Sequence, residues 1–328
     1  MKDSVLVLAE VTDGKMMAPS FSETLRAGQQ IAQANESTIH ALVLGHNVNK
    51  TVEEMLHYGV DAVYVADDPR LDVYHPDYYL AAFRTACKEI RPTTILMGHT
   101  LQAIDCAPRL AFDLDAVLVT DCTGLKIDAG EILYLKPVFS SHILAGYAAD
   151  PPVIITIRSK SFEAAVRGES RQGKVVPIPL QLDQVTIRTP VTSRVVHERE
   201  GIKIEDAEVI VAGGRGIGSA EGFEKLAELA HTIGAAVGAS RPPIDMGWVS
   251  ADAQIGQTGT IVAPNVYFAI GISGAMQHLA GMSRSKKIIA INKDKEASIF
   301  KVADYGAVGT YEEIVPALTQ AFREHVKA

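Results

Sequence analysis

Hydrophobic and polar positions alternate in blocks along the first third of the chain. Short apolar runs of strand length are separated by longer segments with helical periodicity, which predicts strand–helix–strand crossovers and a parallel sheet. We therefore expect an α/β first lobe that is doubly wound. The predicted strands span 4–10, 38–45, 61–67 and 93–98, and the predicted helices span 20–36, 50–59, 76–90 and 101–114.

The pattern changes after Ala116. Apolar runs of strand length now follow one another with only short polar turns between them, and no helical segment intervenes. Such spacing favours hairpins over crossovers, so we expect an antiparallel extension of the first lobe. The predicted strands of this extension span 116–127, 131–139, 142–148 and 153–159.

A charged segment that lacks sustained apolar periodicity, 191–207, is interpreted as a linker. Beyond it the strand–helix alternation resumes, so the second lobe is predicted to be a Rossmann-like domain with a parallel sheet. The predicted domains are 1–190 and 208–328, each of ordinary domain size. In the second domain the predicted strands span 207–214, 265–271 and 286–292, and the predicted helices span 220–234, 274–282 and 311–327.

Composition narrows the class of protein. A net charge of −8 over 328 residues disfavours a nucleic-acid surface, which needs concentrated Lys and Arg. The apolar runs are far shorter than the ~20 residues of a membrane span, and the N-terminus has no signal-peptide pattern. Cys87, Cys106 and Cys122 are odd in number and lack C-x-x-C spacing, so neither disulfides nor a metal site is expected. The expected compartment is the cytoplasm.

The segment GISGAMQHLAGM (271–282) follows a predicted strand directly, and three interpretations compete for it. A nucleophile elbow needs glycine where Ala275 stands, and His278 lies on the same helix as Ser273, where a base cannot reach it easily. A phosphate cradle fits better, because Gly271 and Gly274 would let a ligand approach the backbone at a helix start. A plain tight turn is the third interpretation.

Three further polar segments occur at predicted strand ends of the second lobe. The loop 212–222 narrowly fails the dinucleotide fingerprint, with Ser219 at the last glycine position, and it contains Arg215. A long glycine-punctuated stretch, 238–264, is of a kind that is uncommon in compact domains unless it binds a ligand. The strand-end sequence AINKD brings polar residues to the carboxyl edge of the sheet. Together these segments predict a nucleotide or dinucleotide site in which the cofactor supplies the chemistry.

These segments resemble a known family. VAGGRG, GAAVGASRPPIDMGWV, QIGQTGTIVAPNVYFAIGISGAMQHLAGM and AINKDKEASIFKVADYGAVG are similar to the carboxyl-terminal domain of the electron-transfer flavoprotein alpha subunit. The resemblance covers about 208–320 closely, and the first lobe more loosely. It implies that the second domain binds FAD and that an electron-transfer flavoprotein beta subunit binds the first domain to complete a heterodimer.

The resemblance also implies roles for individual residues. Phosphates would be held by Arg215, Ser240 and the Ser273–Gly274 turn, while Arg241 would lie against the isoalloxazine. Where some relatives have an acidic residue that meets the adenine, this chain has Thr310. The remaining expected FAD contacts are Gln257 and Thr258 at the flavin edge, Gln277 and His278 at the ribityl chain and flavin O2, and Asn292 along the cofactor.

A cation beside the ring system would stabilise the negative charge that a flavin gains on reduction. At an effective dielectric constant of 20, a charge about 4 Å away contributes up to ~4 kcal/mol. Either Arg241 or a protonated His278 is a candidate for this cation. A hydroxyl donor at N5, such as Thr258, would add a smaller stabilisation of ~1 kcal/mol.

The functional hypothesis from the sequence is a carrier that takes electrons from flavin dehydrogenases of the acyl-CoA dehydrogenase type, in fatty acid β-oxidation, and passes them to an acceptor such as a quinone reductase. An electron-bifurcating variant with NADH and a second FAD is an alternative. An NAD-dependent enzyme is a further alternative, although Glu221 and Glu224 lie too close to the first glycine loop to bind the ribose.

Overall fold

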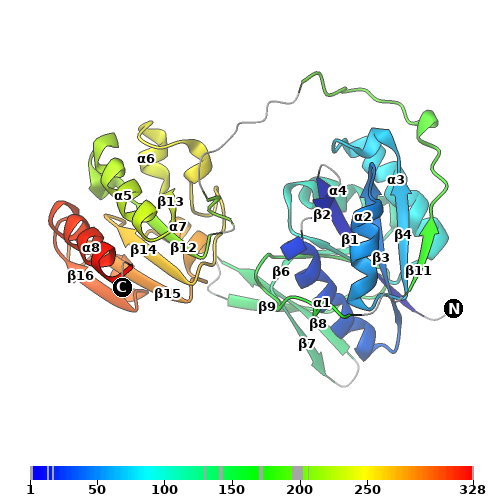
Figure 1. The fold of residues 1–328 in the computed structure, drawn as a ribbon. Helices are drawn as coiled ribbons and strands as arrows, with labels where there is room; N and C mark the ends of the chain where they lie inside the picture. The colour runs from blue at the N-terminus through cyan, green and yellow to red at the C-terminus, as the bar shows by residue number, and fades with distance from the viewer. Residues whose placement is uncertain are drawn as a thin grey trace. The chain divides into compact units, whose positions relative to one another are not determined.

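The chain divides into two compact units, Met1–Val195 and Val196–Ala328. Figure 1 draws unit 1 from blue to green and unit 2 from yellow-green to red. Of the predicted linker, residues 194–201 and 206 lie outside the described residues. The computed structural model describes residues 3–12, 15–16, 18–128, 131–139, 143–169, 173–193, 202–205 and 207–326.

Unit 1 is built on an eight-stranded sheet whose pairings are parallel except for that of one two-residue strand. Its strands are β1 (Ser4–Thr12), β2 (Lys15–Met16), β3 (Thr38–Gly45), β4 (Ala62–Asp67), β5 (Thr94–Gly98), β6 (Val117–Cys122), β10 (Val153–Ile157) and β11 (Lys174–Pro177). The order across the sheet is β11-β4-β3-β1-β5-β10-β6, and β2 pairs with β1. The sequence pattern did not predict β11.

Helices cover both faces of this sheet, as the doubly wound prediction requires. Val5 and Val7 of β1 pack with one cluster, while the intervening Leu6 and the following Leu8 pack with the other. The first cluster includes side chains of α1 and α2, and the second includes side chains of α3 and α4. The helices are α1 (Ala18–Ala34), α2 (Asn49–Met55), α3 (Pro76–Ile90) and α4 (Leu101–Leu114).

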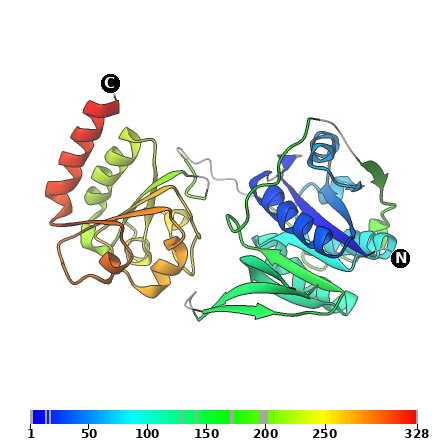
Figure 2. The same cartoon turned by 90° about the horizontal axis from the view of Figure 1, so that it is seen from below.

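The predicted antiparallel extension is confirmed for only some of its strands. β7 (Gly124–Asp128), β8 (Glu131–Val138) and β9 (Ile143–Tyr147) form an antiparallel sheet of their own, seen in green in Figure 2. The expectation was wrong for β6 and β10, which pair in parallel within the large sheet. All residues of β10 are buried, and a continuous apolar run of this kind is typical of a parallel strand covered on both faces.

Local capping explains why α3 and α4 have the predicted bounds. His75 precedes α3 and accepts a hydrogen bond from the Asp77 amide, and Pro76 occupies the first helical position, where its missing N–H costs nothing. Thr100 caps α4 by accepting from the Ala103 amide. Both helices are followed by a residue in the left-handed conformation, Arg91 or Asp115.

Unit 2 is a five-stranded sheet in which every pairing is parallel. The strands are β12 (Val209–Gly213), β13 (Ala236–Ala239), β14 (Val266–Ile270), β15 (Lys287–Asn292) and β16 (Tyr305–Val308), in the order β13-β12-β14-β15-β16. Its helices are α5 (Ala220–Thr232), α6 (Arg241–Asp245), α7 (Met276–Met282) and α8 (Tyr311–Val326). The sequence pattern missed β13, α6 and β16. Because α6 and the end of β13 fall within 238–264, this stretch contains more regular structure than the predicted loop.

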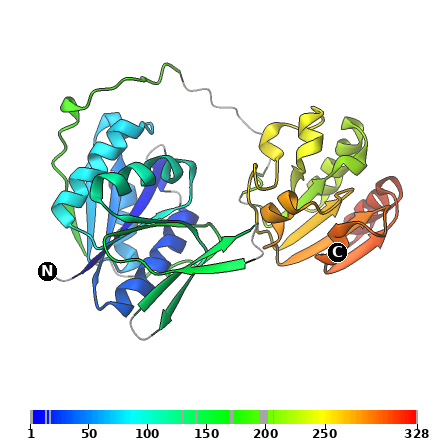
Figure 3. The same cartoon turned by 180° about the vertical axis from the view of Figure 1, so that it is seen from behind.

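Two buried clusters lie on the two faces of this sheet. On one face, Phe223 and Leu226 of α5 and Val315 of α8 pack against β12 and β14. Figures 2 and 3 show α5 in yellow-green and α8 in red side by side on that face. The other face is covered by Met282 of α7, by Ile299, and by the loop that follows α6. The prediction of a doubly wound second lobe is confirmed.

Within the ranges that the structure describes, no helix is both long enough and apolar enough to cross a bilayer.

Candidate functional site

A cavity of about 920 Å³ opens at the carboxyl edge of the unit 2 sheet. The turns that follow β12, β13, β14 and β15 all contribute to it. β13 and β14 lie on opposite sides of β12, so the strand order reverses here, and ligands of doubly wound sheets bind at such switch points. The lining residues are Arg215, Gly216, Ser240, Arg241, Pro242, Gln254, Ile255, Gly256, Gln257, Thr258, Gly271, Ile272, Ser273, Ala275, Gln277, His278, Asn292, Lys293, Asp294, Glu296, Ala297 and Ser298.

The glycines after β12 and β14 pack the two turns against each other. Gly214 donates its N–H to Ile270 O at 2.8 Å, and Gly216 donates to Gly271 O at 3.0 Å. A Cβ on Gly214 would lie 2.2 Å from the Gly271 carbonyl oxygen, so no larger residue fits. The missing side chains are therefore required by backbone packing between neighbouring strands, in addition to any approach of a ligand.

Gly274 does not line the cavity, although the sequence placed it at the phosphates. It is buried with φ +88°, and a Cβ there would lie 2.2 Å from the Ile299 nitrogen. The Ile299 amide also donates to Ser273 O at 3.0 Å. The glycine is needed because the turn after β14 packs against the turn at Ile299, while the exposed Ser273 faces the cavity.

Ser240 and Arg241 follow β13 on one wall. Ser240 is buried and lies directly before the first residue of α6. Its hydroxyl makes no capping hydrogen bond to the helix amides, so it can bind a ligand. The Arg241 Nε lies 3.3 Å from a carboxylate oxygen of Asp245, one turn along α6, and both side chains are mostly exposed. An exposed pair of this kind contributes little to stability, so Arg241 can exchange Asp245 for a ligand. Arg215, on the turn after β12, is also exposed.

The loop after α6 brings Gln257 and Thr258 to the cavity. Gln254, to which the sequence assigned no role, donates a hydrogen bond from its side-chain amide to the Thr258 hydroxyl at 3.0 Å. The Thr258 oxygen accepts this bond, so its own proton remains for another acceptor. The Gln257 backbone amide donates to Gln277 O at 2.7 Å, which ties the loop to α7.

His278 is buried, and both of its ring nitrogens have partners within the protein. Nδ1 lies 3.0 Å from Ile255 O, and Nε2 lies 3.0 Å from the Tyr267 hydroxyl. Burial lowers the pKa of His278 to about 4, so the ring is neutral at pH 7. In the flavin-free protein Arg241 is therefore the cation of the two candidates, and His278 is neutral.

Asn292 begins the wall formed by the turn after β15. Its side-chain amide donates to Ile272 O at 2.9 Å, which holds it against the turn after β14. Asp294 N donates to the Asn292 side chain, and Glu296 N donates to the Asp294 side chain, so the wall is built of successive side chain–backbone turns. Glu296, Ala297 and Ser298 also line the cavity, although the sequence assigned no role to them. Thr310 lies outside the lining and accepts from Ile314 N at the start of α8.

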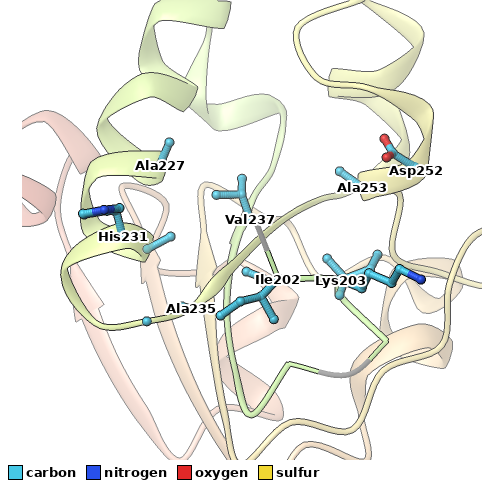
Figure 4. A pocket seen from close by; sticks show the side chains of 12 residues that line it. Ile202, Lys203, Ala227, His231, Ala235, Val237, Asp252 and Ala253 are labelled. Carbon is cyan, nitrogen blue, oxygen red and sulfur yellow. The ribbon is translucent and has the colours of Figure 1, made fainter. Parts of the chain in front are cut away.

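A second cavity of about 530 Å³ lies beside the start of β13 and the end of α5, at the opposite edge of the sheet (Figure 4). Its lining is mostly small and apolar, with Lys203, His231 and Asp252 as its charged or titratable residues. It contains none of the sequence-predicted site residues. The chemistry of unit 2 therefore gathers at the larger cavity.

The larger cavity fits a dinucleotide. Its volume lies near the upper end of the ~300–1,000 Å³ range of small-molecule sites. Arg215, Arg241 and Lys293 supply cations for a negatively charged cofactor, and hydroxyl and amide groups line much of the remaining wall. Nine of the ten residues that the sequence assigned to FAD line it, with Gly274 as the exception. The fold and this site define a dinucleotide-binding domain of the doubly wound class.

Comparison with known proteins gives the particular family. Residues 203–283 match the Electron transfer flavoprotein FAD-binding domain, and residues 5–182 match the Electron transfer flavoprotein domain. The chain belongs to the electron-transfer flavoprotein family and is similar throughout to its alpha subunits. FAD is therefore the cofactor of unit 2.

Curated relatives match over nearly their whole length. An electron transfer flavoprotein subunit alpha from Bacillus subtilis (strain 168) is 40% identical over 99% of this chain and 98% of the relative. Protein FixB from Clostridium saccharobutylicum is 37% identical over 99% and 97% of the two chains. The acryloyl-CoA reductase electron transfer subunit beta from Anaerotignum propionicum is 35% identical over 98% and 95%.

Proposed function

We propose that this chain is the FAD-carrying alpha subunit of a heterodimer that moves electrons between larger enzymes. Its FAD would receive electrons from flavin dehydrogenases of the acyl-CoA dehydrogenase type in fatty acid β-oxidation, and would release them to an acceptor such as a quinone reductase. The observation that carries this proposal is the gathering of the predicted FAD residues around one cavity at the switch point of unit 2. The relative named as an acryloyl-CoA reductase electron transfer subunit supports a redox partner that acts on an acyl-CoA, although a reductase would accept the electrons rather than donate them.

Individual residues would divide the work of holding the cofactor. FAD supplies the redox chemistry when it is bound, since its ring system accepts and releases electrons. Arg215, Ser240 and Ser273 would hold the phosphates, Arg241 would lie against the ring, and Gln257 and Thr258 would reach the ring edge. Gln277, His278 and Asn292 would complete the walls.

Arg241 is the residue that we propose tunes the flavin. An arginine side chain carries a permanent positive charge. Within the part of the chain that the structure describes, Arg241 pairs with the exposed Asp245. A cation at the ring stabilises the reduced cofactor relative to the oxidised one, and so raises the reduction potential. Thr258 would assist with its free hydroxyl proton.

Unit 1 is proposed to form the interface with the beta subunit, with the domain limits 1–190 and 208–328 and a linker at 191–207. Exposed apolar side chains on two of its elements support this role. Leu101 and Phe112 of α4 are 86% and 88% exposed, and Ile143 and Leu144 of β9 are 54% and 57% exposed. Contacts with a partner would remove these groups from water.

The cytoplasm is the proposed compartment. Cys87, Cys106 and Cys122 are free and buried. Burial raises the pKa of the Cys87 and Cys106 thiols to about 12, which keeps them protonated and unreactive. Free thiols of this kind suit a reducing environment.

Two rival functions are disfavoured by particular residues. A serine hydrolase would need a base at Ser273, but both nitrogens of His278 bond to Tyr267 and Ile255. An NAD-dependent enzyme would use an acidic residue after the second strand, where this chain has Ser240 and Arg241.

Cofactor content of the purified heterodimer tests the proposal. We expect a yellow complex that holds FAD in unit 2, and titration of the stripped protein should show tight binding of FAD and weak binding of NAD. One flavin with one AMP would indicate a simple carrier, and two flavins would indicate the bifurcating alternative. A colourless complex that FAD cannot reconstitute would refute the assignment.

A further inference from the structure

A short hydrogen-bond chain links the core of unit 2 to the wall of the cavity. It runs from the Tyr267 hydroxyl to His278 Nε2, and from His278 Nδ1 to the Ile255 carbonyl oxygen, with 3.0 Å at each step. A carbonyl oxygen can only accept, so the Nδ1 atom carries the proton. In the neutral ring Nε2 is then bare and accepts from Tyr267. Tyr267 is completely buried, and burial raises the pKa of its phenol, which stays a donor.

The end of this chain is the start of a loop that lines the cavity. Ile255 is followed directly by Gly256, Gln257 and Thr258, all of which line the cavity. Gln277 lies on the same helix as His278, and its backbone carbonyl accepts a hydrogen bond from the Gln257 amide at 2.7 Å. α7 therefore holds this loop through one side chain and through its own backbone.

Close backbone packing leaves this loop little freedom to adjust. A Cβ on Gly281 of α7 would lie 2.4 Å from the Gly256 nitrogen. Val262 N, at the far end of the loop, donates to Gly281 O at 2.7 Å. If the bond from His278 to the Ile255 carbonyl is lost, we expect the displacement of Ile255 to pass to the residues that follow it, because the closely packed backbone cannot form a substitute bond.

We propose that His278 is a positioning residue whose Nδ1–H, with the ring oriented by Tyr267, holds the Ile255–Thr258 loop in the shape that lines the cavity. Both nitrogens act within the protein, so the ring works through the loop. Gln257 and Thr258 depend on it for their place in the wall. This inference rests on the proposed function only in its prediction about FAD affinity, because the other measurements are made on the flavin-free protein.

A matched pair of substitutions separates this role from a direct contact made by Nε2. Asparagine carries its amide about as far from the backbone as histidine carries Nδ1, whereas glutamine carries it about as far as Nε2. His278→Asn should therefore restore the bond to Ile255 O, and His278→Gln should not. If Nε2 were the functional atom, the order of the two variants would be reversed.

Amide hydrogen exchange in the flavin-free heterodimer gives the readout. In peptides covering 254–262 we expect wild-type protection in His278→Asn and exchange about tenfold faster in His278→Gln, as the loss of one buried hydrogen bond implies. The β15 peptide, 287–292, should exchange equally in all variants and so serves as the control for folding. FAD affinity should fall about tenfold in His278→Gln and by less than threefold in His278→Asn.

Tyr267→Phe tests the other end of the chain and keeps the ring that packs in the core. Exchange in 254–262 should again be faster, whereas Tyr134→Phe, at a buried tyrosine of unit 1, should leave it unchanged. The inference is overturned if His278→Gln keeps wild-type protection, if asparagine fails to restore it, or if Tyr267→Phe has no effect. Failure of the wild-type complex to bind FAD would refute the proposed function but not this inference, because the exchange is measured without flavin.

Discussion

The hydroxyl of Thr100 donates to the carboxyl group of Glu10, which joins the carboxyl ends of β5 and β1 in unit 1. Glu10 is only 5% exposed, and burial raises the pKa of its carboxyl group from the ordinary value of 4.5 to about 7. The strand order of the large sheet reverses at this pair, because β3 lies on one side of β1 and β5 on the other. A polar group is thus enclosed at the switch point of unit 1.

This pair makes the stability of unit 1 sensitive to pH. Folded Glu10 binds its proton more tightly than unfolded Glu10, so stability should fall as the pH rises from 4.5 through 7. The full loss is about 2–4 kcal/mol. In Glu10→Gln this slope should flatten, as measured by urea denaturation followed by hydrogen exchange in unit 1. The exposed control Glu89→Gln should keep the wild-type slope, and the prediction is wrong if Glu10→Gln keeps it too.

The burial of His278 should give the stability of unit 2 the opposite dependence on pH. Its folded pKa of about 4 lies below the ordinary value of 6.5, so stability is fully present above pH 6.5 and is lost as the pH falls toward 4. The loss is about 2–4 kcal/mol. Trp248 is the only tryptophan of the chain and lies in unit 2, so its fluorescence during denaturation reports on this unit. His278→Asn should remove the slope, while His231→Gln, at an exposed histidine, should retain it.

Gly214→Ala should destabilise unit 2 by about 1–3 kcal/mol, because the added methyl group meets the Gly271 carbonyl oxygen at 2.2 Å. The clash is with the backbone of the turn that directly follows β14, so neither turn can move without disturbing the sheet. The midpoint of urea unfolding followed by Trp248 fluorescence measures the effect. Gly146→Ala in unit 1, where the nearest atoms would be 3.6 Å away, is the control for an added methyl group. Followed by hydrogen exchange in unit 1, it should change stability by less than about 0.5 kcal/mol.

Arg241→Gln should lower the reduction potential of the bound FAD by roughly 20–60 mV, since about 1.4 kcal/mol corresponds to 59 mV for one electron. The effect is modest because Arg241 is largely exposed and water screens its charge. Potentiometric titration of the heterodimer measures the shift. Arg323→Gln removes an arginine of α8 that pairs with Glu228, and should leave the potential unchanged. An equal shift in both variants would mean that the potential follows net charge rather than a cation at the ring.

Much of the fold could be predicted because its signals are local. The bounds of α3 and α4 follow from Pro76, from the Thr100 cap and from the spacing of apolar residues within each helix. The turn after β14 could be predicted because Gly271 and Gly274 directly follow a continuous apolar run, and glycine allows the sharp change of direction at the end of a strand. β13 and β16 were missed because AVGA and YGAV are four residues long and contain glycine and alanine, which carry little strand preference.

By itself the sequence determined the alternation of elements and the residues that would gather at the carboxyl edge of unit 2, because strand periodicity and strand ends are properties of neighbouring residues. Only the tertiary structure decided that β6 and β10 enter the parallel sheet, and that Gly274 packs against Ile299 rather than facing the cavity. It likewise decided the charge of His278, whose partners Tyr267 and Ile255 are 11 and 23 residues away. A pKa depends on burial and on such distant partners, and neither is written in the local pattern.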